Sequence, residues 1–89
     1  MPRAVVCINT DFFAADIVLA ELRECENVEE AFRVYGVYDV IAKVRAETTE
    51  KLLDFITEYI KSLPNVQSTH TMLIVDSMIS KKEERHMIV

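Results

Sequence analysis

The only glycine of this 89-residue chain, Gly36, lies between two runs of strand-like apolar residues. Glycine adopts positive φ more readily than any other residue, so its position predicts the tight turn of a β-hairpin. The strand before the turn is expected over residues 28–35 and the strand after it over residues 39–46. The fold of this chain is therefore expected to contain two adjacent antiparallel strands joined by this turn.

The hairpin also carries binding chemistry. Asp39 stands where the second strand begins, and a carboxylate there can bind an ammonium group. The turn exposes backbone N–H groups, which can bind a carboxylate. Together these groups match a free amino acid. The alternative is purely structural, with Gly36 making the turn and Asp39 capping it.

The rest of the chain alternates strand and helix patterns. Residues 3–9 form a short β-branched run typical of a central strand, and residues 66–75 a fourth strand. Residues 13–25 repeat apolar side chains at helical spacing, after possible capping side chains at residues 9–11. Thr48 is the expected N-cap of a second helix, which ends at Pro64. Glu29 and Glu30 are adjacent and are expected on opposite faces of their strand.

The resulting order is β-α-β-β-α-β, the α+β ferredoxin-like pattern, with an antiparallel sheet and both helices on one face. Residues 1–89 are expected to form one domain, in which 77–89 are a tail ending in a short closing strand at Met87-Ile88-Val89. Hydrophobic residues make up 51% of the chain, more than so small a domain buries alone. We therefore expect two sheets to pack face to face in a dimer.

Several function classes are disfavoured. A net charge of −5 and a pI near 4.9 argue against direct nucleic-acid binding. The cysteines, Cys7 and Cys25, are too few for a disulfide framework or zinc site and suit a reducing cytoplasm. We find no phosphate-binding loop, nucleophile elbow, metal-ligand spacing or membrane-length apolar run. The sequence predicts a chain without catalytic residues or cofactor.

Three segments resemble the Lrp/AsnC (feast/famine) regulators. Residues 35–39, Tyr-Gly-Val-Tyr-Asp, are similar to the Gly-x-Tyr-Asp turn of their RAM domain (regulation of amino acid metabolism). Residues 66–75 resemble its Val-x-x-Thr-x-Thr strand, and Met87-Ile88-Val89 its closing strand. The family's usual chain begins with a helix-turn-helix domain, whereas this sequence begins at the first strand, as in the stand-alone RAM form. Tyr35 also departs from the threonine common in full-length members.

The resemblance implies a homodimeric α/β barrel, assembly of four such dimers into an octamer, and a free amino acid bound between dimers. By this resemblance, Asp39 holds the effector's ammonium group and the backbone amides near the turn hold its carboxylate. The residues that contact the effector would come from two dimers: Gly36, Val37, Tyr38 and Asp39 from one, and Ser68, Thr69 and Thr71 from its neighbour. The domain would act in transcriptional or metabolic regulation, and its partners would be full-length Lrp/AsnC regulators or metabolic enzymes.

Two alternatives remain open. One is a small dimeric α/β-barrel enzyme of the monooxygenase or isomerase type, which would need a polar cavity inside each barrel. The other is an ACT-like regulatory domain, which shares the element order and amino-acid binding. The location of the pocket, between dimers or inside one subunit, separates the sensor from the enzyme.

Overall fold

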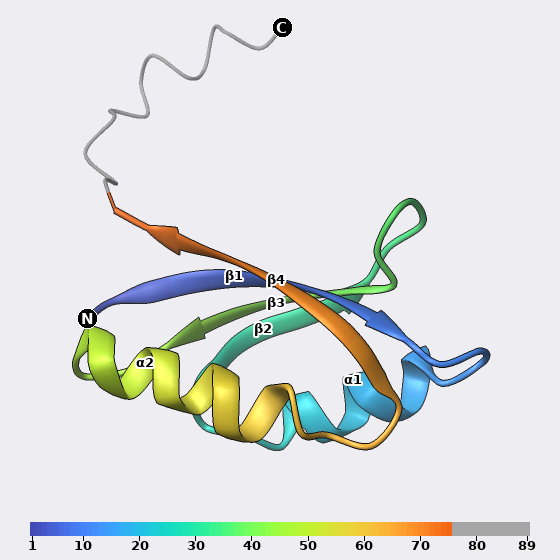
Figure 1. Ribbon diagram of the computed structural model, residues 1–89, viewed down its shortest axis with the longest axis horizontal. Coiled ribbons are helices and arrows are strands. Elements are labelled where there is room, and N and C mark those ends of the chain that lie inside the picture. Colours follow the sequence, from blue (N-terminus) through green and yellow to red (C-terminus); the bar gives the residue numbers. More distant parts are fainter. Residues whose placement is uncertain (76–89) are drawn as a thin grey trace, which may run out of the picture.

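A computed structural model describes residues 1–75, so the expected tail with its closing strand lies outside the described residues. The π-helical segment η1 directly continues α2, and the elements follow one another as β1 (Arg3–Thr10), α1 (Ala15–Arg23), β2 (Val28–Arg33), β3 (Val40–Arg45), α2 (Thr49–Phe55), η1 (Ile56–Ile60) and β4 (Val66–Ile74). The predicted β-α-β-β-α-β order is confirmed (Figure 1).

The four strands form one antiparallel sheet in the order β2-β3-β1-β4. β1 is central, as its apolar sequence predicts, and pairs with β3 on one side and β4 on the other. Both helices lie against the same face of the sheet, with η1 extending α2 along it (Figure 1). This is the ferredoxin-like α+β fold.

The core lies between the sheet and the helices. Alternate residues of β1 and β3 point toward the helices, and the helices contribute residues spaced three or four apart. All of the following are at most 9% exposed: Ala4, Val6, Ile8, Val18, Leu19, Leu22, Val40, Ala42, Val44, Leu52, Ile56 and Ile60. The apolar stripes expected from the helical periodicity are thus the ones that are buried.

Helix ends follow the sequence prediction in one case and not in the other. Thr48 caps α2, and its Oγ1 accepts a hydrogen bond from the Lys51 N–H at 3.0 Å. The prediction of side-chain capping from residues 9–11 is wrong, because α1 begins at Ala15 with Ala14 as its N-cap and no side-chain cap. Instead the backbone carbonyl of Asp11 accepts from the Ala14 N–H at 3.0 Å.

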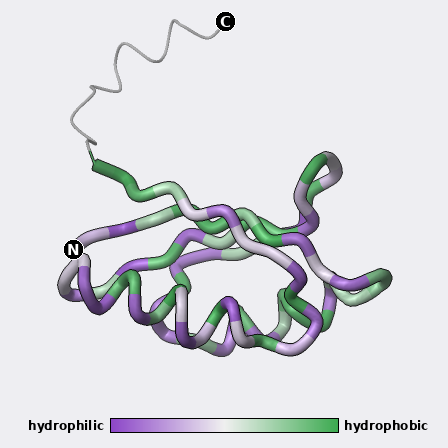
Figure 2. Tube along the Cα trace, in the orientation of Figure 1, coloured by the Kyte–Doolittle hydropathy of each residue, from purple (hydrophilic) through white to green (hydrophobic). Residues whose placement is uncertain are grey.

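Within residues 1–75, no helix covers the opposite face of the sheet (Figure 1). Cross-strand neighbours share a face, so the register places Val5, Cys7, Ile41 and Met72 on this open face beside charged residues. Figure 2 shows hydrophobic stretches at the end of β4 and at the tip of the β2–β3 hairpin. Apolar surface therefore remains uncovered in a single chain.

One prediction about the open face is wrong. A β-bulge between Val28 and Glu30 shifts the register of β2, so the two adjacent glutamates do not alternate. Glu29 Oε1 lies 3.2 Å from Arg3 Nη2, and Glu30 Oε2 lies 3.3 Å from Lys43 Nζ. Arg3 and Lys43 belong to the open face, so both carboxylates meet cations there.

Candidate functional site

The connection between β2 and β3 covers residues 34–39, so it is longer than the tight turn that the sequence predicts. The Val34 N–H closes it by donating to the Asp39 carbonyl at 3.1 Å. Gly36 has φ +145°, a conformation that residues with a Cβ rarely adopt, which confirms the need for glycine there. Tyr35 and Val37, 98% and 81% exposed, stand beside it at the tip.

Asp39 ties the hairpin to the end of β1. Its Oδ2 accepts from the Thr10 N–H at 2.8 Å and from the Thr10 hydroxyl at 3.3 Å, and its own N–H donates to the Ile8 carbonyl at 2.9 Å. These bonds support the structural alternative, a carboxylate that fixes the backbone. Oδ1 accepts no hydrogen bond from the described part of the chain, so this oxygen can still bind a ligand.

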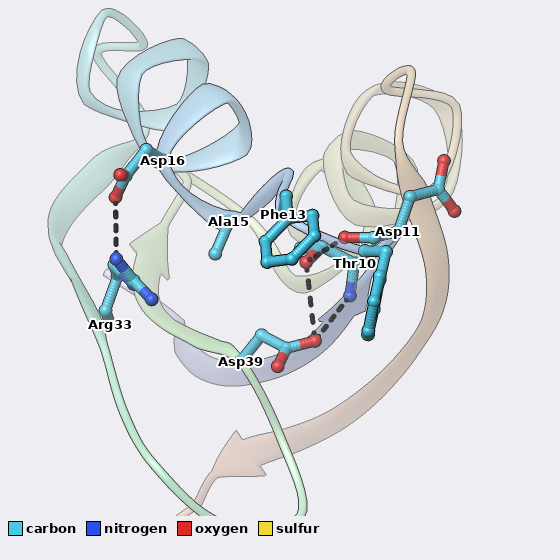
Figure 3. A pocket seen from close by; sticks show the side chains of 8 residues that line it. Thr10, Asp11, Phe13, Ala15, Asp16, Arg33 and Asp39 are labelled. Atoms are coloured by element: carbon cyan, nitrogen blue, oxygen red, sulfur yellow. Dashed lines mark hydrogen bonds and ion pairs between the residues drawn. The ribbon is translucent and has the colours of Figure 1, made fainter.

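A pocket of about 320 Å³ opens beside Asp39, between the end of β1, the start of α1 and the end of β2. Its wall is formed by Thr10, Asp11, Phe12, Phe13, Ala15, Asp16, Arg33 and Asp39 (Figure 3). Arg33 Nη1 lies 3.1 Å from Asp16 Oδ1 on one side of the opening. Asp39 lies on another side of the opening (Figure 3).

Two phenylalanines of this wall were not singled out as site residues from the sequence. Phe12 and Phe13 are 86% and 94% exposed, and their ring centroids are 4.7 Å apart at an interplanar angle of 49°. Phe13 has φ +60°, which is strained for an aromatic residue. The helical periodicity had placed Phe13 at the start of the helix, so its exposed position was missed. The only signal was an apolar pair directly after polar residues.

The predicted contacts on β4 lie elsewhere in the same chain. Thr69 and Thr71 pair with Ile8 and Val6, so they share the helix-facing side of the sheet and are half-buried. Ser68 is on the open face, where its Oγ accepts from Asn9 Nδ2 at 3.3 Å. Strand spacing puts β3 and β4 about 10 Å apart across β1, so one chain does not bring Asp39 and these residues together.

Tyr38 brings the hairpin near β4. Its ring centroid is 6.3 Å from that of His70, which is paired with Cys7 on the open face. Tyr38 is half-buried, whereas His70 is exposed to solvent. Of the seven predicted contacts, Gly36, Val37, Tyr38 and Asp39 share one loop, and the three β4 residues divide between the two faces of the sheet.

The part of the chain from residue 1 to residue 75 contains no cluster of three or more histidine, cysteine or acidic side chains arranged to hold a metal ion. None of its helices combines the length and apolarity needed to span a membrane.

The fold is a ferredoxin-like α+β domain with a pocket beside the end of β1. Residues 3–84 match the family model of the Lrp/AsnC ligand binding domain. The chain therefore belongs to the Lrp/AsnC family, as the resemblance of the hairpin and β4 motifs predicted.

Relatives and solved structures agree with this assignment. The HTH-type transcriptional regulator FL11 of Pyrococcus abyssi is 34% identical over 58 residues, which are 65% of this chain and 38% of that protein. The matched part of this chain thus spans well under half the length of this relative. The crystal structure of FFRP-DM1 is 37% identical with a TM-score of 0.82, covering 84% of this chain and 100% of that one. Hypothetical protein PHS023 of Pyrococcus horikoshii is 36% identical with a TM-score of 0.80, covering 88% and 94%.

A more distant structure shares the fold alone. The transcriptional regulator NMB0573 of Neisseria meningitidis, solved as a complex with L-Met, is 15% identical with a TM-score of 0.76, covering 86% of this chain and 51% of that one.

Proposed function

We propose that this chain is an amino-acid-binding regulatory module of the Lrp/AsnC type, with a free amino acid as effector and no catalytic step or cofactor. The observation that carries the proposal is Asp39 Oδ1, which accepts no hydrogen bond from residues 1–75 and lies at the edge of an open pocket, in a chain that belongs to a ligand-binding family. The L-Met complex of the distant regulator supports an amino acid as the class of ligand.

In this proposal Asp39 binds the effector's ammonium group through Oδ1, while Thr10 holds Oδ2 in place. A carboxylate whose position is already fixed loses little freedom when the ligand arrives, which favours binding. Backbone N–H groups from Gly36 to Tyr38 contribute to holding the effector's carboxylate.

The contacts from β4 come from another copy. In one chain β4 is about 10 Å from β3 across β1, so in this proposal Ser68, Thr69 and Thr71 are supplied by a neighbouring dimer. Their hydroxyls donate and accept hydrogen bonds and so suit either end of the effector.

Assembly follows from the open sheet face. Its mixture of apolar and charged side chains, with Arg3 and Lys43 paired to glutamates, suits a second sheet in a face-to-face dimer. We propose an α/β barrel dimer and an octamer of four such dimers. The module would act in the cytoplasm through full-length Lrp/AsnC regulators or metabolic enzymes, without contacting nucleic acid itself.

Isothermal titration of the purified chain with each of the twenty amino acids tests the proposal. We expect saturable heat with at least one L-amino acid and none with the same compound lacking its α-amino group, because Asp39 needs the ammonium. An absence of binding across the whole set, at millimolar ligand, would contradict the proposal.

A further inference from the structure

One row of side chains crosses the open face of the sheet from edge to edge. The register pairs Phe32 with Ile41, Ile41 with Cys7, and Cys7 with His70, so the row runs across β2, β3, β1 and β4. Cys7 is only 5% exposed, although no helix of residues 1–75 covers this face, so its neighbours cover the thiol. The row is apolar except at its β4 end, where His70 is exposed to solvent.

The immediate surroundings of His70 offer no partner for a positive charge. Within residues 1–75, no ion pair includes His70. Its neighbours on this face are Ser68 and Met72 along β4 and the thiol of Cys7 on β1. The centroid of the Tyr38 ring is 6.3 Å from that of His70, just beyond the roughly 6 Å at which an aromatic ring attracts a cation. Water therefore stabilises the charge of a protonated His70 in a single chain.

The other charged side chains of the open face lie away from β4, and its glutamates are already paired. Ion pairs of 3.2–3.8 Å join the following residues: Glu29 with Arg3 and Arg45, and Glu30 with Lys43. Asp39 directly precedes β3, which β1 separates from β4, and its Oδ2 accepts two hydrogen bonds from Thr10. None of these carboxylates neutralises His70, so a proton on His70 adds positive charge to a face with three cations and two glutamates.

We propose that His70 makes the dimer pH-sensitive, because a second copy of the chain can cover the open face only while His70 is neutral. A histidine side chain changes its charge between pH 5 and 8. A second sheet removes the water that stabilises the charged form, and burying an unpaired charge is costly. Protonation also adds two like charges to one interface, since both copies present the same row.

This inference rests on the proposed dimer and adds a regulation of its assembly. The second copy suits the face because the ion pairs within each chain neutralise most of its charge and leave the apolar row between them. The single chain binds a proton that the dimer excludes, so acid favours dissociation.

Sedimentation of the full chain at pH 8 and pH 5.5, from nanomolar to micromolar concentration with a fluorescent label, tests the inference. Each excluded proton changes the equilibrium by up to about tenfold per pH unit, and a dimer excludes two. We expect the dissociation constant of the dimer to be at least about tenfold higher at pH 5.5 than at pH 8. Aspartate and glutamate side chains are still largely ionised at the lower pH and contribute little. An equal or lower dissociation constant at pH 5.5 would overturn the inference.

Three variants assign the effect to one side chain. His70→Gln stays neutral, and its dissociation constant should change by less than about threefold between the two pH values. His70→Lys is charged at both and should dimerise about tenfold to a hundredfold more weakly than the native chain at pH 8, which tests the inference without acidification. His86→Gln changes the only other histidine of the chain and should keep the full pH dependence.

Each variant also has a result that would overturn the inference. These results are a pH dependence that persists in His70→Gln, one that disappears in His86→Gln, or a His70→Lys dimer as tight as the native one. Circular dichroism at both pH values confirms that each variant is folded. If the native dimer is equally tight at both pH values, this inference fails and the proposed dimer stands. If the chain is monomeric at pH 8, both fail.

Discussion

Replacing Asp39 by asparagine should separate the two roles of its carboxylate. The change preserves the size of the side chain and one acceptor oxygen but removes the charge. From the sequence alone, the fold's melting temperature would be expected to stay nearly unchanged. The two bonds from Thr10 to Oδ2, at 2.8 Å and 3.3 Å, change that expectation, because an amide oxygen accepts these bonds less strongly.

The size of both effects follows from hydrogen-bond energies. Bonds to a charged group contribute about 1.5–3 kcal/mol and neutral ones about 0.5–1.5, so weakening the short bond from the Thr10 N–H should cost about 1 kcal/mol of stability. For a domain of this size that lowers the melting temperature by about 4–8 °C. Losing the charged contact to the effector's ammonium should weaken binding about tenfold to a hundredfold.

Calorimetric titration and thermal unfolding at one fixed protein concentration measure the two effects. Thr10→Val is the control, since it removes the hydroxyl, whose one proton is shared between the Asp11 carbonyl at 3.1 Å and Asp39 Oδ2 at 3.3 Å, but keeps the charge of Asp39 and the Thr10 backbone N–H. It should lower stability and leave effector affinity within about threefold. If Asp39→Asn lowers the melting temperature yet binds the effector as tightly as the native chain, Asp39 is only a structural residue.

The remaining predictions concern the fold and assembly. Gly36→Ala should destabilise the chain by about 1–3 kcal/mol in chemical denaturation, through backbone strain alone, because no atom lies within 4 Å of the added methyl; unchanged stability would contradict this. Thr48→Ala removes the cap on the Lys51 N–H and should cost about 1 kcal/mol, whereas Thr48→Ser should restore it. Burial raises the pKa of Tyr59 above 10.0. Just above pH 10 the folded chain therefore keeps the phenol proton of Tyr59, whereas the unfolded chain loses it. Stability should therefore fall as the pH rises above about 10, and this loss should shrink in Tyr59→Phe, measured by denaturation between pH 8 and 11. Light scattering should give a mass of at least two chains at micromolar concentration, and a mass near 10.2 kDa would refute the proposed dimer.

The fold could be predicted because its signals are local and mutually consistent. Alternation in residues 40–45 and helical spacing from Val18 to Leu22 each identify one buried face, and the element order then leaves few topologies. The bulge next to Glu29 was missed because a bulge inserts one residue without interrupting the run of strand-like residues. The π-helical segment Ile56–Ile60 was missed because apolar spacing does not distinguish it from an α-helix.

The candidate site was predicted only in part. The hairpin with Gly36 and Asp39 has a recognisable motif, so it could be located in the sequence. Thr10, Phe12 and Arg33 come from other parts of the chain and meet Asp39 only through the sheet topology. No short sequence motif indicates that these residues lie near Asp39 in the fold.

A crystal structure of the chain with its tightest-binding amino acid tests the central claim most directly. We predict ligand density beside Asp39, with the ammonium within hydrogen-bond distance of Oδ1. Density between the two sheets of a barrel dimer, remote from Asp39, would contradict the account and favour a small α/β-barrel enzyme.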